Sequence, residues 1–157
     1  MIRATLAAAV IAIGVTAVAA HSSKNFDPAN PVDQRAMLMH KQADIVYGTF
    51  KKMVRGQAPY DQAKVDEGFA ALKEIAPKLP ELYPATAKGR SPDSDYYASD
   101  KVWENKAEFD AHFKKLIAAI DANAPKATSL DGLQAARKAV AEACDEARER
   151  RSAPASV

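Results

Sequence analysis

The chain of 157 residues contains a single cysteine, Cys144, and only three histidines. One cysteine cannot form an internal disulfide, so packing must hold the fold together. No block of lysine or arginine stands out, since 22 basic and 20 acidic residues are interspersed and give a formal net charge of +2. Without a basic patch, no nucleic-acid partner is expected. No nucleophile–base set, glycine-rich phosphate loop or carboxylate pair occurs, so we expect no enzyme.

The first twenty residues have the pattern of an export signal. Arg3 supplies a positive charge, and a mostly apolar run over residues 4–20 ends in Ala19 and Ala20. A short apolar run with a small-residue exit is typical of a secretory signal peptide. The run is slightly short of the roughly 20 residues that a membrane-spanning helix needs. We therefore predict a cleaved signal peptide and a periplasmic protein; an uncleaved membrane anchor formed by residues 4–20 is the alternative.

A long amphipathic helix opens the rest of the chain. It begins at Pro31, behind the N-cap Asn30, and ends before Gly56. Proline suits the first helical position because a backbone N–H there has no intrahelical partner. Apolar residues recur at steps of three and four, the spacing of one helix face. That face consists of Val32, Ala36, Met39, Ala43, Val46, Phe50 and Met53.

Three more helices with an apolar stripe follow. Their predicted N-terminal caps are Asp61, Asn105 and Ser129. Pro77 ends the second helix, and Asn105 forms a capping-box pattern with Glu108. Residues 77–104 are too long for a tight turn, so we expect them to cross the bundle. The sequence thus predicts an all-α, antiparallel four-helix bundle over residues 21–157, with a long crossover between helices two and three.

Five short elements, in the same order along the chain, resemble those of the class II cytochromes c, the cytochrome c-prime group and its low-spin relatives. They are Arg35-Ala36-Met37-Leu38-Met39, Gly56-Gln57-Ala58-Pro59-Tyr60-Asp61, Leu79-Pro80-Glu81-Leu82-Tyr83-Pro84, Val102-Trp103-Glu104-Asn105 and Ala139-Val140-Ala141-Glu142-Ala143-Cys144. The resemblance covers residues 28–151. It implies a haem site at Met39, the axial ligand of low-spin members, at Arg35 near the haem propionates, and at Cys144.

The haem-attachment motif of this chain is degenerate. A c-type haem is attached through Cys-x-x-Cys-His, whereas Cys144 is followed by Asp145, Glu146, Ala147 and Arg148. The second thiol is missing, and a guanidinium offers no lone pair to iron. These departures predict that no cofactor is bound. They favour an exported, haem-free accessory protein, either a homodimer or a subunit of a periplasmic or membrane redox complex.

Two other functions stay open at this point. The first is a periplasmic haem-binding cytochrome for electron transfer or gas binding, as the resemblance implies. The second is a copper-binding protein, because thioether sulfur and imidazole suit copper. Its candidate ligands are Met37 and His40, three residues apart on one helix face, and His21, the N-terminus after cleavage behind Ala20.

Overall fold

The computed structural model describes residues 26–89, 91 and 98–149, without the side chains of residues 147–149. Within these ranges every regular element is helical. In chain order they are α1 (Pro31–Ala43), η1 (Asp44–Thr49), α2 (Phe50–Val54), α3 (Gln62–Lys78), η2 (Leu79–Leu82), α4 (Lys101–Glu104), α5 (Lys106–Asn123), η3 (Ala124–Lys126) and α6 (Leu130–Glu149). The predicted signal peptide or anchor, residues 1–20, lies outside this description. Among the described residues, no helix is long and apolar enough to cross a membrane.

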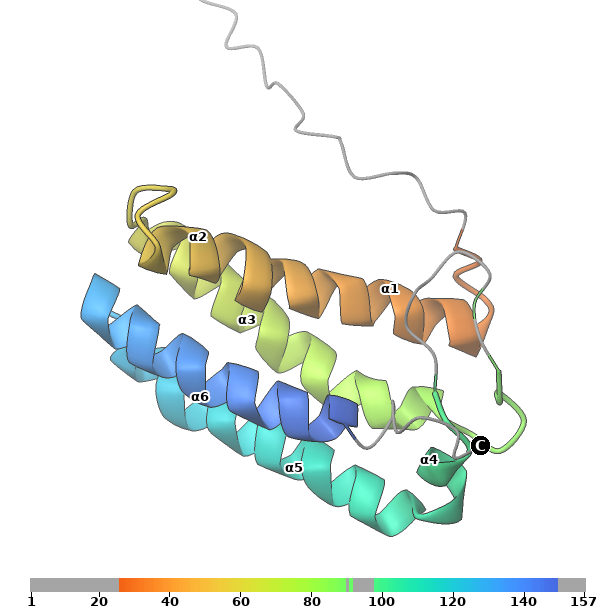
Figure 1. The fold of residues 1–157 in the computed structure, drawn as a ribbon. Coiled ribbons are helices and arrows are strands. Elements are labelled where there is room, and N and C mark those ends of the chain that lie inside the picture. The colour runs from red at the N-terminus through yellow and green to blue at the C-terminus, as the bar shows by residue number, and fades with distance from the viewer. Residues whose placement is uncertain (1–25, 90, 92–97, 150–157) are drawn as a thin grey trace, which may run out of the picture.

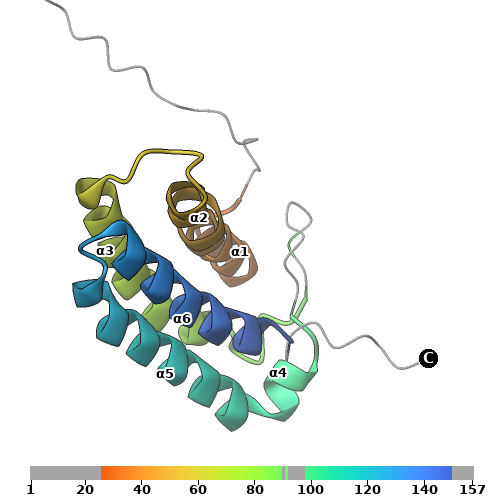
Figure 2. The same ribbon diagram turned by 60° about the vertical axis from the view of Figure 1, so that its left-hand side comes forward.

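The helices form the antiparallel four-helix bundle that the sequence predicted (Figure 1). α1, η1 and α2 make one continuous rod that runs opposite to α3, while α5 and α6 make a second antiparallel pair (Figures 1 and 2). α5 packs against both α3 and α6, and α2 packs against α6. The crossover from α3 to α5 carries the short helices η2 and α4.

A π-helical turn interrupts the first rod. The rod starts as predicted, because Asn30 Oδ1 accepts a hydrogen bond of 2.9 Å from the Val32 N–H, and it ends at Gly56, whose φ is 68°. Between these ends, η1 is π-helical, so its backbone hydrogen bonds span five residues instead of four. The sequence predicted an α-helix here, because Val46 and Phe50 have helical spacing. Both residues are buried as expected.

Two residues of the predicted inward face, Val32 and Ala43, are only half-buried. Beside Ala43, Gln42 takes the inward position with 6 % of its surface exposed. The apolar pattern did not predict Gln42 as a core residue, because burying an amide costs free energy unless the amide finds a hydrogen-bond partner. The partner that makes its burial possible comes from α6 and is described below.

The predicted helix ends are confirmed in two places and wrong in two others. Asp61 caps α3 by accepting a bond of 3.2 Å from the Lys64 N–H, and Ser129 Oγ accepts one of 3.1 Å from the Gly132 N–H. α3 continues through Pro77, because a proline in the last turn removes only one backbone bond. Asn105 forms no side-chain cap; its amide bonds the Glu108 carboxylate instead.

A single apolar core runs through the bundle and includes residues from every long helix. α3 approaches α2 closely at Gly68, where a Cβ would lie 2.6 Å from the Phe50 ring. Phe50 in turn packs against Phe69, with ring centroids 5.0 Å apart. At the other end of the core, Tyr83 from the crossover meets Phe109 edge to face at 4.6 Å. These contacts pack α2 against α3 at one end of the core and the crossover against α5 at the other.

Candidate functional site

The three residues that the resemblance singled out lie on α1 and α6 and are buried. Arg35 and Met39 are four residues apart on one face of α1, with 4 % and 7 % of their surface exposed. Cys144 on α6 is 7 % exposed and belongs to the same core as Met39. The structure thus directs the two sulfur atoms of Met39 and Cys144 into one apolar interior.

Gln42 connects the two helices at this site. It lies three residues after Met39 on the same face of α1. Its Nε2 donates a hydrogen bond of 3.0 Å to the Sγ of Cys144. Its other polar atom, Oε1, is buried and has no hydrogen-bond partner. Sequence analysis missed Gln42; the available signal was a single amide at a position where the helical spacing places a side chain inward.

A second contact between the first rod and α6 lies on the surface beside Cys144. The hydroxyl of Tyr47 donates a bond of 2.8 Å to Asp145 Oδ1 and lies 3.4 Å from the Ala141 carbonyl oxygen. Tyr47 belongs to the π-helical turn η1. The first rod and the Cys144 segment are therefore held together inside the core, through Gln42 of α1, and at its edge, through Tyr47 of η1.

Arg35 closes the end of the site that faces the crossover. Its guanidinium donates bonds of 2.7 Å to the Ala87 carbonyl and 2.5 Å to the Gly89 carbonyl. The same group stacks over the ring of Tyr83 at 4.8 Å and lies 5.8 Å from the ring centre of Trp103. A planar fork with five donors can bond two carbonyls and stack at once, which lysine cannot do. Arg35 thus fixes the crossover above α1.

Two of the three copper candidates, Met37 and His40, lie in the part of the chain that the structure describes. Met37 is 42 % exposed, whereas His40 is half-buried with its ring 5.9 Å from that of Phe26. His21 lies outside the described residues. Within them, no group of three or more histidine, cysteine, aspartate or glutamate side chains is placed to hold a metal ion. Copper binding stays a prediction.

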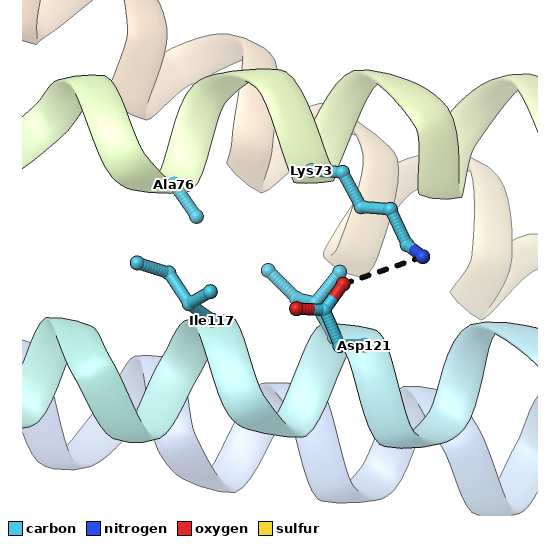
Figure 3. A pocket seen from close by; sticks show the side chains of 5 residues that line it. Lys73, Ala76, Ile117 and Asp121 are labelled. Atoms are coloured by element: carbon cyan, nitrogen blue, oxygen red, sulfur yellow. Dashed lines mark ion pairs between the residues drawn. The ribbon is translucent and has the colours of Figure 1, made fainter.

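A small cavity lies elsewhere, between α3 and α5 (Figure 3). It has a volume of about 30 Å³, which is room for one or two water molecules. An ion pair of 3.3 Å between Lys73 and Asp121 lies at its edge. Its other lining residues are Ala76, Ile117 and Ile120. A space of this size holds no organic cofactor.

The comparisons with known proteins assign the family. The family model described as Cytochrome C' matches residues 30–147, so the chain belongs to the cytochrome c' family. It is 33% identical to cytochrome c-556 of Rhodopseudomonas palustris, over 92% of both chains. It is 34% identical to cytochrome c-555 of Bradyrhizobium diazoefficiens, over 74% of this chain and 78% of that one. The solved structure of cytochrome c' from Rhodopseudomonas palustris superimposes with a TM-score of 0.71 and 31% identity, covering 81% of this chain and 98% of the other.

These findings correct one prediction. The expectation that the chain binds no cofactor is wrong, because both the family and the relatives that match most of the chain are cytochromes, which are haem proteins. That expectation was drawn from Ala147 and Arg148 alone. The match extends over residues 30–147 and so includes Arg35, Met39 and Cys144. Haem is also held by apolar contacts and by ligands outside the attachment motif, such as a methionine on another helix.

The residues described at the site offer a haem group a thioether and one thiol but no imidazole from α6. Met39 offers a buried thioether, a known axial ligand of haem iron, and Cys144 offers one thiol for covalent attachment. The unpaired Oε1 of Gln42 beside that thiol shows that the polar contacts of this spot are incomplete in the chain by itself. Arg148 replaces the histidine, so α6 supplies an anchor but no imidazole.

Proposed function

We propose that this chain is an exported haem-binding cytochrome that acts in electron transfer or in gas binding and is not an enzyme. The observation that carries the proposal is that Met39 and Cys144 are buried in one core, where Gln42, three residues after Met39, donates a hydrogen bond to Cys144. Membership of the cytochrome c' family supports it. The export signal predicted for residues 1–20 supports a periplasmic location.

In this proposal each residue has a separate task. Bound haem supplies an iron centre that can change its oxidation state or take a gas molecule. Met39 would supply a thioether sulfur to the iron, and Cys144 would hold the group covalently through a single thioether. The surrounding core keeps water away from both sulfur atoms, since Phe113, Leu116 and Val140 are each 1 % exposed. Arg35 holds the crossover in place over the same end of α1.

The replacement of histidine by Arg148 favours gas binding over electron transfer. A guanidinium has no lone pair for iron, so α6 would supply no ligand to a bound haem. An open position is what a small gas molecule requires, whereas low-spin electron carriers of the Met/His type fill both positions. The homodimer and the redox-complex partner that the resemblance implies both remain predictions, which the mass of the purified protein in solution would test.

The proposal is tested by making the full chain in a bacterial periplasm with the cytochrome c maturation machinery. We expect a Soret band and one haem per chain, and a shift of that band when carbon monoxide is added. In Cys144→Ser the haem should become extractable by acidified acetone. Met39→Leu should alter the spectrum, whereas Met53→Leu, another buried methionine with 3 % of its surface exposed, should not.

A chain that leaves the periplasm colourless, and also binds no added haemin, would overturn the proposal. A Soret band that is identical in the wild type and in Met39→Leu would keep haem binding but remove Met39 from its ligand role.

A further inference from the structure

The contact between Gln42 and Cys144 is a part of the site that the resemblance does not account for. The two residues are 102 positions apart in the chain, and their contact is buried at 3.0 Å. Gln42 is 6 % exposed and leaves its Oε1 without a partner. An amide buried in this way loses its bonds to water and recovers only part of them. A leucine or methionine would fill the same space without burying an unpaired polar atom. We therefore attribute the amide to its contact with the thiol.

We propose that Gln42 is a positioning residue for the Cys144 thiol, which it orients and activates toward a soft electrophile. The identity of that electrophile, a vinyl side chain of haem, rests on the proposed function. The thiolate, rather than the thiol, is the attacking form of cysteine. An amide N–H that donates to Sγ favours the negative charge, and it also holds the sulfur on the side of α6 that faces α1.

The bonds balance without any further reactant. The sulfur forms a bond to one carbon of the vinyl group, and the carbon–carbon π bond breaks. The thiol proton ends on the other carbon, so no oxidation or reduction is needed. Gln42 stays unchanged, because it stabilises the sulfur only while that atom is negatively charged.

The carboxylates next to Cys144 are engaged with other groups. Asp145 accepts the hydrogen bond from Tyr47. Glu146 lies 3.6 Å from the Lys115 ammonium and 3.9 Å from His112, on the side of α6 that faces α5. Gln42 reaches the sulfur from the α1 side as a neutral donor.

The test measures the alkylation of Cys144 by iodoacetamide in haem-free protein. Because the chain has one cysteine, mass spectrometry of the whole protein reports that residue alone. The rate is followed from about pH 6 to about pH 10, which covers the range where thiols ionise. Gln42→Met keeps the length of the side chain but removes its donor. Gln42→Glu keeps the shape and adds a charge, and it also serves if Gln42→Met fails to fold.

We expect Gln42→Met to react about fivefold more slowly near pH 7.5, as the loss of one hydrogen bond predicts. The midpoint of its pH–rate profile should move to higher pH, and the plateau at high pH should be unchanged. Gln42→Glu should react more slowly still, because a carboxylate opposes the thiolate. Gln134→Met, at an exposed glutamine of α6, should match the wild type.

A midpoint that stays at the wild-type pH in both Gln42 variants would overturn the proposal. A purely structural role for Gln42 would change how often the core opens and so the plateau, but not the midpoint. The measurement needs no haem. A negative alkylation result would therefore overturn the role of Gln42 alone. The absorption spectrum tests the proposed function separately.

Discussion

The guanidinium of Arg35 and the carbonyl of Ala87 are joined by a buried hydrogen bond of 2.7 Å between residues 52 positions apart. This bond ties the first helix to the described part of the crossover between η2 and α4. Since Arg35 also bonds Gly89 and stacks on Tyr83, a single side chain organises this end of the bundle. The relationship has a direct consequence for stability.

Replacing Arg35 by methionine should lower the free energy of unfolding by about 3 kcal/mol, because two carbonyls lose a charged donor. Arg35→Lys keeps the charge but not the planar fork, and should lose about half as much. Urea unfolding followed by the fluorescence of Trp103, the one tryptophan of the chain, measures both. An unchanged urea midpoint in Arg35→Met would mean that the crossover is held by other contacts.

A methyl group at Gly68 should destabilise the bundle. The added Cβ would lie 2.6 Å from two atoms of the Phe50 ring, which is 1 % exposed and cannot swing away. We expect Gly68→Ala to cost about 2 kcal/mol, the usual range for overpacking, even though alanine is the better helix former.

Gly48 provides the matched control. A Cβ there meets nothing within 4 Å, so Gly48→Ala should be neutral or should stabilise the protein by up to about 1 kcal/mol. Urea unfolding of the two variants side by side separates crowding from helix propensity. Equal effects at both positions would show that the contact between α2 and α3 can relax.

Stability should fall in alkaline solution because of Tyr60. Partial burial, and secondarily the Asp66 carboxylate, raise the pKa of Tyr60 above its ordinary value of 10.0. The folded chain therefore holds the phenol proton more tightly than the unfolded chain. This contribution is complete below about pH 10 and is lost as the pH rises through the higher folded pKa.

Tyr60→Phe removes the titrating group and should flatten this part of the pH dependence. It should also lose the bond of 3.1 Å from the hydroxyl to the Ala127 carbonyl at every pH. Urea midpoints of both proteins at about pH 9 and about pH 11 give the comparison. If the urea midpoint falls by the same amount in both proteins, lysines rather than Tyr60 cause the loss of stability in alkaline solution.

Removing the cap of α6 should have a modest effect. Ser129→Ala leaves the Gly132 N–H without its partner and should cost about 1 kcal/mol. The exposed neighbour Thr128 serves as the control, and Thr128→Ala should leave the thermal midpoint unchanged. If Ser129→Ala is neutral as well, water caps the helix equally well.

The sequence was a good guide to the bundle because the features that form it are local. Proline and N-cap residues set the starts of α1 and α3, and helical spacing identified their buried faces. The π-helical turn could not be foreseen, since residues 44–49 have the same apolar spacing as an α-helix. The capping box at Asn105 failed because its amide found a side-chain partner three residues away, a competition that the pattern does not show.

The site was predicted only in part. Arg35, Met39 and Cys144 are buried as the resemblance implied, but Gln42 depends on a contact between residues far apart in the chain. The cofactor prediction failed for a different reason. It gave more weight to Ala147 and Arg148 in the attachment motif than to the resemblance over the rest of the chain, which the family match covers.

The π-helical turn also has a consequence for how the chain is compared with its relatives. Backbone bonds that span five residues accommodate one residue more than an α-helix of the same length would contain. A homologue with one residue fewer between Met39 and Gly56 could therefore keep both ends of its first helix in register, and the missing residue would fall inside the helix instead of in a loop. Alignments that permit gaps only between helices would displace the second half of that segment by one position.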